Sequence, residues 1–284
     1  MTARGDCRNG ENVDEKAALA AARPPAPSAA VRPPMPDPNA LIPPPLTPAA
    51  DVDAALAATG FAVVGPAGIA SLAGVPLAAL DAWQPAWNRL PADAYLLDGG
   101  KYRQRRHGVF VVDGDQVSAA PHRPHWQPVD YNALHGGIER HFEPLEPALA
   151  QDPAWARVLA ALAARASALK GAQRWYVEAH TFRIDTASGI GRPTPEGAHR
   201  DGVDLVSVTL VDRHGIKGGE SRVFQAASSA GLRFTLSEPW TTVLLDDARV
   251  IHETTPIQPQ KAGEPGWRDT LVLTFRAGGF QGPR

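Results

Sequence analysis

The stretch Leu205-Val206-Ser207-Val208-Thr209-Leu210-Val211 is the clearest β-strand in the sequence, because apolar and β-branched residues fill it without glycine or proline. Shorter apolar runs at 175–184, 220–224, 240–245 and 270–275 flank it, and Gly, Pro and Asp turns separate them. No long helix pattern interrupts this series. We therefore predict a mainly β protein with flanking helices, and a double-sheet, cupin-like jelly roll is the natural candidate.

The N-terminal part of the sequence has a different character. Residues 1–48 are rich in Ala and Pro and contain few large apolar side chains, which predicts a disordered, partly polyproline II tail. We expect a single folded domain at 49–284, with helices and loops in 49–170 and the jelly-roll core in 171–280. Short strand and helix patterns begin this domain.

After a first helix that ends at Gly60, two further helices and one hairpin are expected before the jelly-roll core. Leu and Trp residues at helical spacing predict an amphipathic helix at 76–90, and an Ala/Leu-rich run predicts another at 152–170. Turn residues near Asp98 lead into an alternating stretch ending at Val112. Asp113-Gly114-Asp115 then predicts a hairpin turn.

Composition limits the classes of function. The chain has 284 residues, 44% of them hydrophobic, and a formal net charge of −2, so nothing indicates a nucleic-acid partner. The single cysteine, Cys7, excludes a disulfide framework within one chain and a cysteine-ligated zinc site. No apolar run or leader pattern indicates a membrane or a secretion route. We expect a cytoplasmic protein, and a homodimer is compatible with these features.

Candidate metal-binding side chains lie immediately before the central strand, in Pro195-Glu196-Gly197-Ala198-His199-Arg200-Asp201-Gly202. On an extended backbone, His199 and Asp201 project from the same face, so they can offer a nitrogen and an oxygen ligand to one ion. His252, in Arg249-Val250-Ile251-His252-Glu253, supplies a second imidazole. Two histidines and one carboxylate, with the other positions open, form the facial triad of non-haem Fe(II) oxygenases.

Arg268 opens the last predicted strand, sixteen residues after His252. An Fe(II) oxygenase of this kind uses 2-oxoglutarate, whose distal carboxylate a guanidinium binds in bidentate fashion. The alternative is a surface arginine paired with Asp269. Taken alone, Arg268 fits that alternative better.

The ordered set of motifs resembles bacterial 2-oxoglutarate/Fe(II) dioxygenases. It comprises 195–202, Gly218-Gly219-Glu220-Ser221, the segment around His252 and Trp267-Arg268-Asp269-Thr270-Leu271-Val272-Leu273-Thr274-Phe275. More narrowly, the chain is similar to the group that contains free L-amino-acid hydroxylases such as L-isoleucine 4-hydroxylase. The arginine-rich stretch after Tyr102 and the region around Gln127 also resemble that group. The likeness spans about residues 50–276.

This resemblance implies a double-stranded β-helix with Fe(II) bound by His199, Asp201 and His252, which are then the catalytic residues. It also implies 2-oxoglutarate anchored by an arginine of the last strand, either Arg268 or Arg276. The expected activity is hydroxylation of an L-amino acid or amino-acid derivative by O2, with release of succinate and CO2.

The substrate residues are less determined by sequence. An amino acid requires a cation for its carboxylate and an acceptor for its ammonium group. Candidates for contacts with the substrate are Arg103, Arg105, Arg106, Arg183, Tyr102, His122, Gln127, Tyr131, Glu178, Asp204 and Glu220. The alternative for the arginine run is a solvated strand or a nucleic-acid patch. Glu178 and His180 share a face, which suits polar groups of the core slightly better than support of the site.

Two rival functions remain at this stage. The first is a 2-oxoglutarate-independent metal enzyme on a cupin-like jelly roll, which would use the same three ligands. The second is a non-catalytic jelly-roll binding module without a metal. A dependence of turnover on 2-oxoglutarate distinguishes the hydroxylase from both. The remaining histidines, His107, His135, His141 and His214, show no partner pattern and are expected at the surface.

Overall fold

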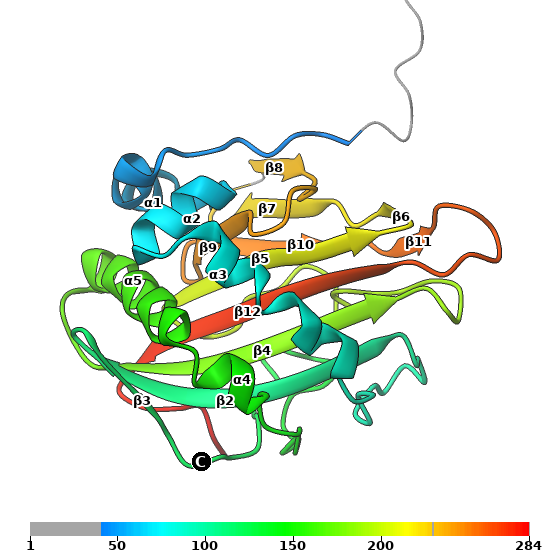
Figure 1. The fold of residues 1–284 in the computed structure, drawn as a ribbon, viewed down its shortest axis with the longest axis horizontal. Helices are drawn as coiled ribbons and strands as arrows, with labels where there is room; N and C mark the ends of the chain where they lie inside the picture. The colour runs from blue at the N-terminus through cyan, green and yellow to red at the C-terminus, as the bar shows by residue number, and fades with distance from the viewer. Residues whose placement is uncertain (1–40, 229, 284) are drawn as a thin grey trace, which may run out of the picture. The chain divides into compact units, whose positions relative to one another are not determined.

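A seven-stranded antiparallel sheet dominates the computed structural model, which describes residues 41–228 and 230–283 (Figure 1). Its strands, in spatial order, are β1 (Phe61–Val64), β9 (Thr242–Asp246), β5 (Leu205–His214), β12 (Trp267–Ala277), β4 (Trp175–Asp185), β2 (Arg103–Asp113) and β3 (Gln116–Ala119). Two smaller sheets complete the β structure. They are formed by β10 (Val250–Thr254), β7 (Ser221–Gln225) and β8 (Gly231–Phe234), and by β11 (Ile257–Pro259) and β6 (Ile216–Gly218).

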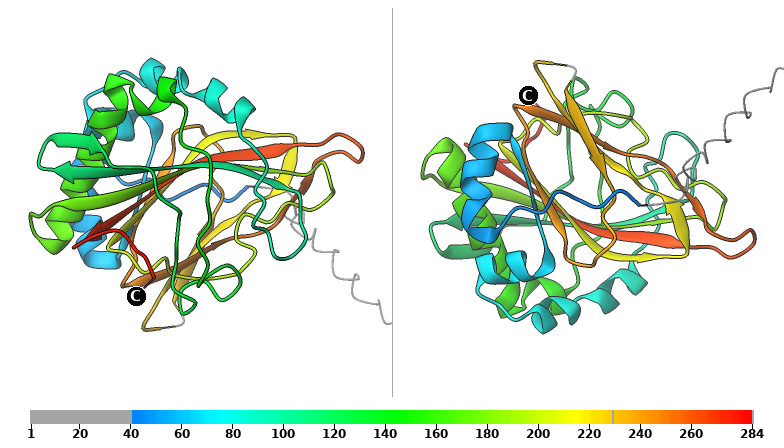
Figure 2. Two further views of the ribbon diagram at one scale, coloured as in Figure 1. Left: turned by 90° about the horizontal axis from the view of Figure 1, so that it is seen from below. Right: turned by 90° about the horizontal axis from the view of Figure 1, so that it is seen from above.

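Helices cover one face of the large sheet, and β7, β8 and β10 lie on the other side (Figure 2). The helices are α1 (Val52–Thr59), α2 (Pro66–Ala73), α3 (Leu77–Asp81), α4 (Pro147–Ala150) and α5 (Pro153–Lys170), with short 3-10 turns at Ala49–Asp51 and Gln84–Arg89. The prediction of a mainly β jelly roll with flanking helices is therefore confirmed.

Strand alternation decides which side chains face the helices. In β4, Trp175, Val177 and Ala179 are buried in the core that the helices share with the sheet. The intervening residues Glu178 and His180 point to the opposite face, because successive strand residues project in opposite directions. The register aligns this second face across strands, so that Val272 of β12 lies beside His180 and His180 beside His107 of β2. That face forms the floor of the functional cleft.

The central prediction, a strand at 205–211, corresponds to β5, which extends to His214. The predicted helix at 152–170 corresponds to α5, whose N-cap Asp152 accepts a hydrogen bond of 2.7 Å from the backbone N–H of Ala154. The single helix predicted at 76–90 is wrong. It is split into α3 and the 3-10 turn Gln84–Arg89, because Pro85 cannot donate a helical hydrogen bond.

The start of the folded domain also differs from the predicted boundary at 48/49. The backbone N–H of Thr47 donates to the carbonyl of Val63 (2.7 Å), and that of Thr235 donates to the carbonyl of Ile42 (2.7 Å). Residues 41–48, predicted to belong to the tail, therefore pair with the domain. The rest of the predicted tail, residues 1–40, lies outside the described residues.

Among the described helices, none is long and apolar enough to span a membrane by itself. One pair, Pro66–Ala73 and Leu77–Arg89, meets the length and composition test only when the two are taken together, and it is bent by 98°.

Candidate active site

The three predicted metal ligands converge from separate parts of the chain. The backbones of His199 and His252 pair as an antiparallel bridge, with N–H to carbonyl distances of 3.0 Å in both directions. Asp201 Oδ1 lies 3.9 Å from His199 Nε2, and Asp201 Oδ2 lies 3.8 Å from His252 Nε2. One ligand atom from each residue falls within 4.8 Å of the others. The sequence did not predict β10, the short strand that carries His252.

The protonation of His199 suits it to ligate a metal. Its Nδ1 lies 2.9 Å from the carbonyl oxygen of Gly197, which can only accept a hydrogen bond. Nδ1 therefore carries a proton, which leaves Nε2, on the side of Asp201, as the ring nitrogen available to a metal. A hydrogen bond of this kind from the other ring nitrogen is the usual way in which proteins orient a metal-binding imidazole.

Asp247 fixes the turn that carries Asp201. Its carboxylate accepts hydrogen bonds from the backbone N–H groups of Asp201 (2.9 Å), Gly202 (2.7 Å) and Val203 (3.1 Å). Burial, together with the charge of Asp201, raises the pKa of Asp247 to about 6. Gly202 has φ +75°, and a Cβ there would meet the ring of Tyr131 at 2.6 Å, so the turn requires glycine.

Gln127 orients the carboxylate of Asp201. Its Oε1 accepts hydrogen bonds from Asn132 Nδ2 (3.1 Å) and from Arg140 Nη2 (2.9 Å). These two donors fix the amide so that Nε2 points the other way and donates to Asp201 Oδ1 (3.1 Å). Gln127 thus contacts the predicted metal site itself.

Arg268 is buried, with 3% of its surface exposed, and lines the cleft. Its neighbour Asp269 pairs with Arg183 instead, at 2.6 Å, so the alternative of a surface arginine paired with Asp269 is wrong. Within the described residues, Nε and Nη2 of Arg268 have no hydrogen-bond partner. Burial, together with the charge of Arg213, lowers the pKa of Arg268 to about 10. A buried guanidinium with free N–H groups fits an anionic ligand.

The second candidate for the 2-oxoglutarate anchor, Arg276, also lines the cleft. It is half-buried, and its Nη1 donates a hydrogen bond of 2.6 Å to the carbonyl of Gly279. Since part of its donor capacity is used by the backbone, Arg276 is less suited than Arg268 to bind a carboxylate of a ligand.

A single cleft brings these groups together, with about 1050 Å³ of space including its mouth open to solvent. Along β2 and β4 the residues that line the cleft occupy alternate positions, because alternate strand residues point to the same face. The polar and charged residues that line it include Arg103, Arg105, His125, Gln127, Asn132, Arg140, Glu178, His180, Glu196, His199, Asp201, His252, Arg268 and Arg276, and Phe182 is one of its aromatic residues.

Four of the residues predicted to contact the substrate line this cleft, namely Arg103, Arg105, Gln127 and Glu178. Arg103 and Arg105 occupy alternate positions of β2 and are buried. Arg103 Nε donates to Asp93 Oδ2 at 2.7 Å. The guanidinium carbon of Arg105 lies 3.8 Å from the ring centroid of Phe142. The alternative of a solvated strand is therefore wrong for both residues.

The other predicted substrate residues do not line the cleft in the described part of the chain; they are Tyr102, Arg106, His122, Tyr131, Arg183, Asp204 and Glu220. Arg106 faces away from it, because its position in β2 has the opposite parity, and pairs with Glu143 at 2.7 Å. The Tyr102 hydroxyl donates to Asp98 Oδ2 at 2.6 Å, beneath an apolar cluster. Tyr131 packs against Gly202, and Glu220 accepts a hydrogen bond of 2.8 Å from Arg222. The structure therefore gives no contact between these side chains and the cleft, and their roles in substrate binding stay predictions.

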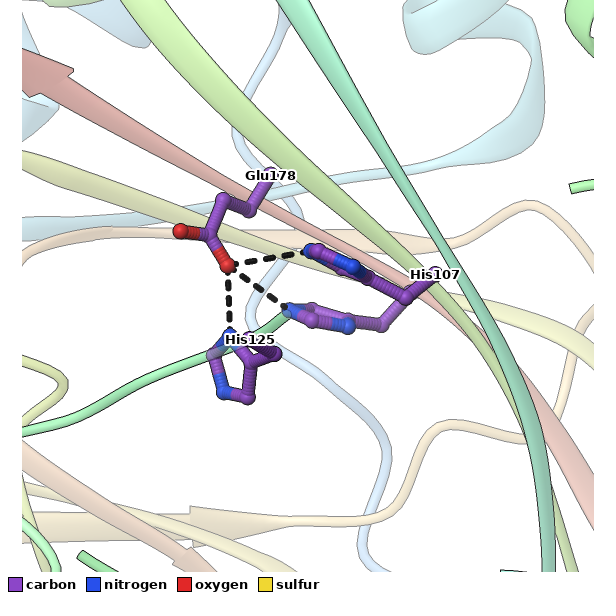
Figure 3. Close-up of side chains that lie close together, drawn as sticks. His107, His125 and Glu178 are labelled. Atoms are coloured by element: carbon purple, nitrogen blue, oxygen red, sulfur yellow. Dashed lines mark hydrogen bonds and ion pairs between the residues drawn. The ribbon is translucent and has the colours of Figure 1, made fainter. Parts of the chain in front are cut away.

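A second group of histidine and carboxylate side chains comprises His107, His125, Glu178 and His180 (Figure 3), and all of them except His107 line the cleft. Glu178 Oε2 is 3.1 Å from His107 Nε2 and 2.5 Å from His125 Nδ1. His180 Nε2 lies 4.0 Å from the same oxygen, while His180 Nδ1 accepts a hydrogen bond of 2.7 Å from Arg105 Nη2. All four side chains are buried, and their ligand atoms lie within 4.8 Å of one another.

The charges of this second group follow from burial. Burial lowers the pKa of His125 to about 3, so this imidazole is neutral at pH 7. Burial opposes ionisation of Glu178, but His125 and His107 outweigh it and lower its pKa. A single anionic oxygen therefore accepts hydrogen bonds from two neutral imidazoles. The surface position predicted for His107 is wrong, since its exposed fraction is 0%, and so is that of His135, at 1%.

Comparison with known proteins identifies the family to which the chain is similar. The profile of the 2OG-Fe dioxygenase family matches residues 84–274. No curated protein matches the chain. A crystal structure of a bsmA homolog from Methylobium petroleophilum PM1 has 51% identity and a TM-score of 0.80, and covers 84% of this chain and 97% of its own.

Two more distant structures share the fold. IDO from Bacillus thuringiensis has 16% identity and a TM-score of 0.66, covering 82% of this chain and 97% of its own. The Fe(II)/(alpha)ketoglutarate-dependent dioxygenase TqaL has 19% identity and a TM-score of 0.60, covering 83% and 90%. The family match spans the cleft and both segments of the triad, and the chain therefore belongs to the 2OG-Fe dioxygenase family.

Proposed function

We propose that this chain hydroxylates an L-amino acid or an amino-acid derivative, using O2 and 2-oxoglutarate and releasing succinate and CO2. Membership of the 2OG-Fe dioxygenase family implies Fe(II), 2-oxoglutarate and O2 as the cofactor and co-substrates. The finer assignment of an amino-acid substrate rests on the sequence resemblance and on the charged groups in the cleft.

We assign Fe(II) to His199, Asp201 and His252. Two imidazole nitrogens and one carboxylate are the donor set of non-haem Fe(II) oxygenases. The carboxylate oxygens of Asp201 lie 3.8–3.9 Å from the imidazole nitrogens, which is too long for hydrogen bonds and leaves room for an ion between them. When bound, the iron would activate O2, with 2-oxoglutarate as the electron donor. The protein would position the substrate for the reaction.

We assign the distal carboxylate of 2-oxoglutarate to Arg268. The observation that carries the proposed function is this buried guanidinium, whose free N–H groups line the same cleft as the triad. An anion there would satisfy donors that are otherwise buried without a partner in the described chain. The surrounding side chains exclude bulk water, which strengthens the ion pair.

The cleft also suits a small zwitterionic substrate. Arg103, Arg105 and Arg140 bring positive charge to it, and Glu178 and Glu196 bring negative charge. A free amino acid offers the complementary pair of charges. The side chains that line the cleft would hold such a molecule in one orientation, so that one carbon faces the triad.

The decisive experiment is an anaerobic titration of the protein with Fe(II) and then with 2-oxoglutarate, followed by a screen of the twenty L-amino acids for succinate formation and product mass. We expect a weak visible charge-transfer band on addition of 2-oxoglutarate, and oxygenated product with at least one amino acid. Asp201→Ala should lose the band, whereas Arg106→Gln, outside the cleft, should keep it.

Two results would contradict the proposal. Turnover that is independent of added 2-oxoglutarate would favour another metal enzyme on the same fold. Absence of the band at millimolar 2-oxoglutarate would favour a non-catalytic binding module. A band without any amino-acid product would retain the dioxygenase chemistry and exclude the proposed substrate class.

A further inference from the structure

Arg140 is a buried cation of the cleft that sequence reasoning did not identify. Its exposed fraction is 2%, and it lines the cleft. Across residues 41–228 and 230–283, no carboxylate lies within ion-pair distance of its guanidinium, and its Nε has no hydrogen-bond partner. Burial, together with the charge of Arg103, lowers the pKa of Arg140 to about 10, so it remains charged at pH 7.

The neighbouring guanidinium groups differ from Arg140 in this respect. Arg103 is paired with Asp93 at 2.7 Å. Arg105 donates a hydrogen bond to His180 and is stacked against Phe142. Its Nη1 also lies 3.9 Å from Asp93 Oδ2. Arg140 is held instead by backbone pairing with His125, at 2.9 and 3.0 Å, so its position is fixed without an ion pair. A fixed, desolvated cation with spare N–H groups is suited to a carboxylate from a ligand.

Arg140 is also connected to the metal site. Its Nη2 donates to Gln127 Oε1 at 2.9 Å, and Gln127 Nε2 donates to Asp201 Oδ1 at 3.1 Å. Arg140 therefore lies two hydrogen bonds away from a proposed iron ligand, and an anion bound to Arg140 would lie three away. Arg268 takes no part in this chain of hydrogen bonds, and it comes from β12, whereas Arg140 comes from the segment that pairs with His125.

We propose that Arg140 is a second anion-binding site of the cleft and that it receives the free α-carboxylate of the substrate. The site selects molecules whose carboxylate is unmodified, and it disfavours amides, esters and carrier-bound residues. Gln127 is the positioning residue that joins this site to Asp201. The identity of the anion as the substrate's carboxylate rests on the proposed function, while the existence of the anion site does not.

The test compares each of the twenty L-amino acids with its primary carboxamide, which keeps the ammonium group and side chain but lacks the negative charge. Binding to the anaerobic Fe(II)/2-oxoglutarate protein is measured by the rise in melting temperature and by tryptophan fluorescence. The variants are Arg140→Gln, which removes the charge, Arg140→Lys, which keeps it without the planar fork, and the control Arg106→Gln.

We expect the best-bound amino acid to bind the wild-type protein about 30-fold or more tightly than its carboxamide, which is typical of a buried charge pair. Arg140→Gln should lose this preference by weakening the amino acid and not the carboxamide. Arg140→Lys should restore part of it, and Arg106→Gln should leave it unchanged. A merely structural role would weaken both ligands equally.

Three results would overturn the proposal: no amino acid binds, the wild-type protein does not distinguish acid from carboxamide, or Arg140→Gln keeps the preference. If Arg140→Gln fails to fold, Arg140→Lys and the wild-type ligand pair still decide the matter. The visible band of the wild-type Fe(II)/2-oxoglutarate complex reports separately on the proposed function, because it forms before any amino acid is added.

Discussion

Two groups of histidine and carboxylate side chains lie in or beside the same cleft, and they differ in spacing. In the first, Asp201 stands 3.8–3.9 Å from the imidazole nitrogens of His199 and His252. In the second, one oxygen of Glu178 lies 2.5 Å from His125 and 3.1 Å from His107. The first group is open, with lone pairs facing a gap, and the second is closed by its own hydrogen bonds. Similar residue types therefore suit different roles, the proposed metal binding in the first group and a neutral-imidazole network in the second.

The guanidinium of Arg105 strengthens this distinction. It donates to His180 Nδ1, which places the proton of that imidazole on Nε2, facing Glu178. A protonated ring nitrogen cannot ligate a metal, and a cation beside the group further disfavours an ion there. The open group has no guanidinium within ion-pair distance of Asp201 in the described part of the chain.

The largest expected effect comes from removing the carboxylate of the first group, compared with neutralising the carboxylate of the second. Asp201→Ala should weaken Fe(II) binding by more than about 100-fold, since removal of a ligand exceeds the 10- to 100-fold cost of losing an outer-shell partner. Glu178→Gln should leave one iron bound per chain. Metal content after anaerobic dialysis measures both, and loss of iron in Glu178→Gln would reverse the assignment of the two groups.

Arg268→Gln should raise the KM for 2-oxoglutarate by about 30-fold or more while iron stays bound, because a buried charge-assisted contact is lost. Steady-state succinate formation at varied 2-oxoglutarate gives the value. Arg276→Gln is the matched control on the same strand, and it should change this KM less. A larger effect at Arg276 would transfer the role of anchor to that residue.

Gln127→Leu should weaken Fe(II) binding by about 10- to 100-fold, because Asp201 loses the amide donor that orients it. The charge-transfer band followed during iron titration provides the measurement. Gln127→Glu serves as a second variant that keeps a hydrogen-bond acceptor for Arg140 but places a negative charge beside Asp201. Unchanged iron affinity in Gln127→Leu would show that the turn held by Asp247 suffices to orient the carboxylate.

The smallest expected effect is a pH dependence of stability that comes from the closed group. His125 has a folded pKa of about 3, well below its ordinary value of 6.5, so the unfolded chain binds its proton first as pH falls. Its contribution to stability is complete above pH 6.5 and declines between pH 6.5 and 3. The lowered pKa of Glu178 acts in the same direction below its ordinary value of 4.5.

Urea unfolding at several pH values, with metal removed, tests this prediction. His125→Asn should flatten the decline between pH 6.5 and 4 relative to the wild-type protein. His141→Asn, which alters an exposed histidine, provides the control. An equal slope in all three proteins would mean that His125 does not titrate as the closed group requires.

The comparison of the two groups also shows what sequence can predict here. Strands at 175–184, 205–211 and 270–275 follow from local apolar and β-branched composition, and the open group follows from the two-residue spacing of His199 and Asp201. The parity of β2 separates Arg103 and Arg105, which face the cleft, from Arg106, which does not. Parity in β4 likewise placed Glu178 and His180 on one face, but not the partners they meet.

His125, Asn132 and Arg140 could not have been assigned from local pattern. They lie in an irregular segment without strand or helix periodicity, and their position depends on a single antiparallel bridge between residues 125 and 140. His252 was assigned by residue type, although β10, which carries it, went unpredicted because Val250–Thr254 alternates weakly. Such positions depend on long-range pairing, which local propensity does not encode.

The three backbone hydrogen bonds accepted by Asp247 have a consequence for protein engineering. Asp247 follows β9 directly and precedes β10, so one short connection both anchors the turn of Asp201 and leads into the strand of His252. The open group is therefore a transferable unit of two segments. Grafting it onto another jelly roll requires Asp247 and Gly202 as well as the three ligands, because without them the donor set would be present but the turn would not be held.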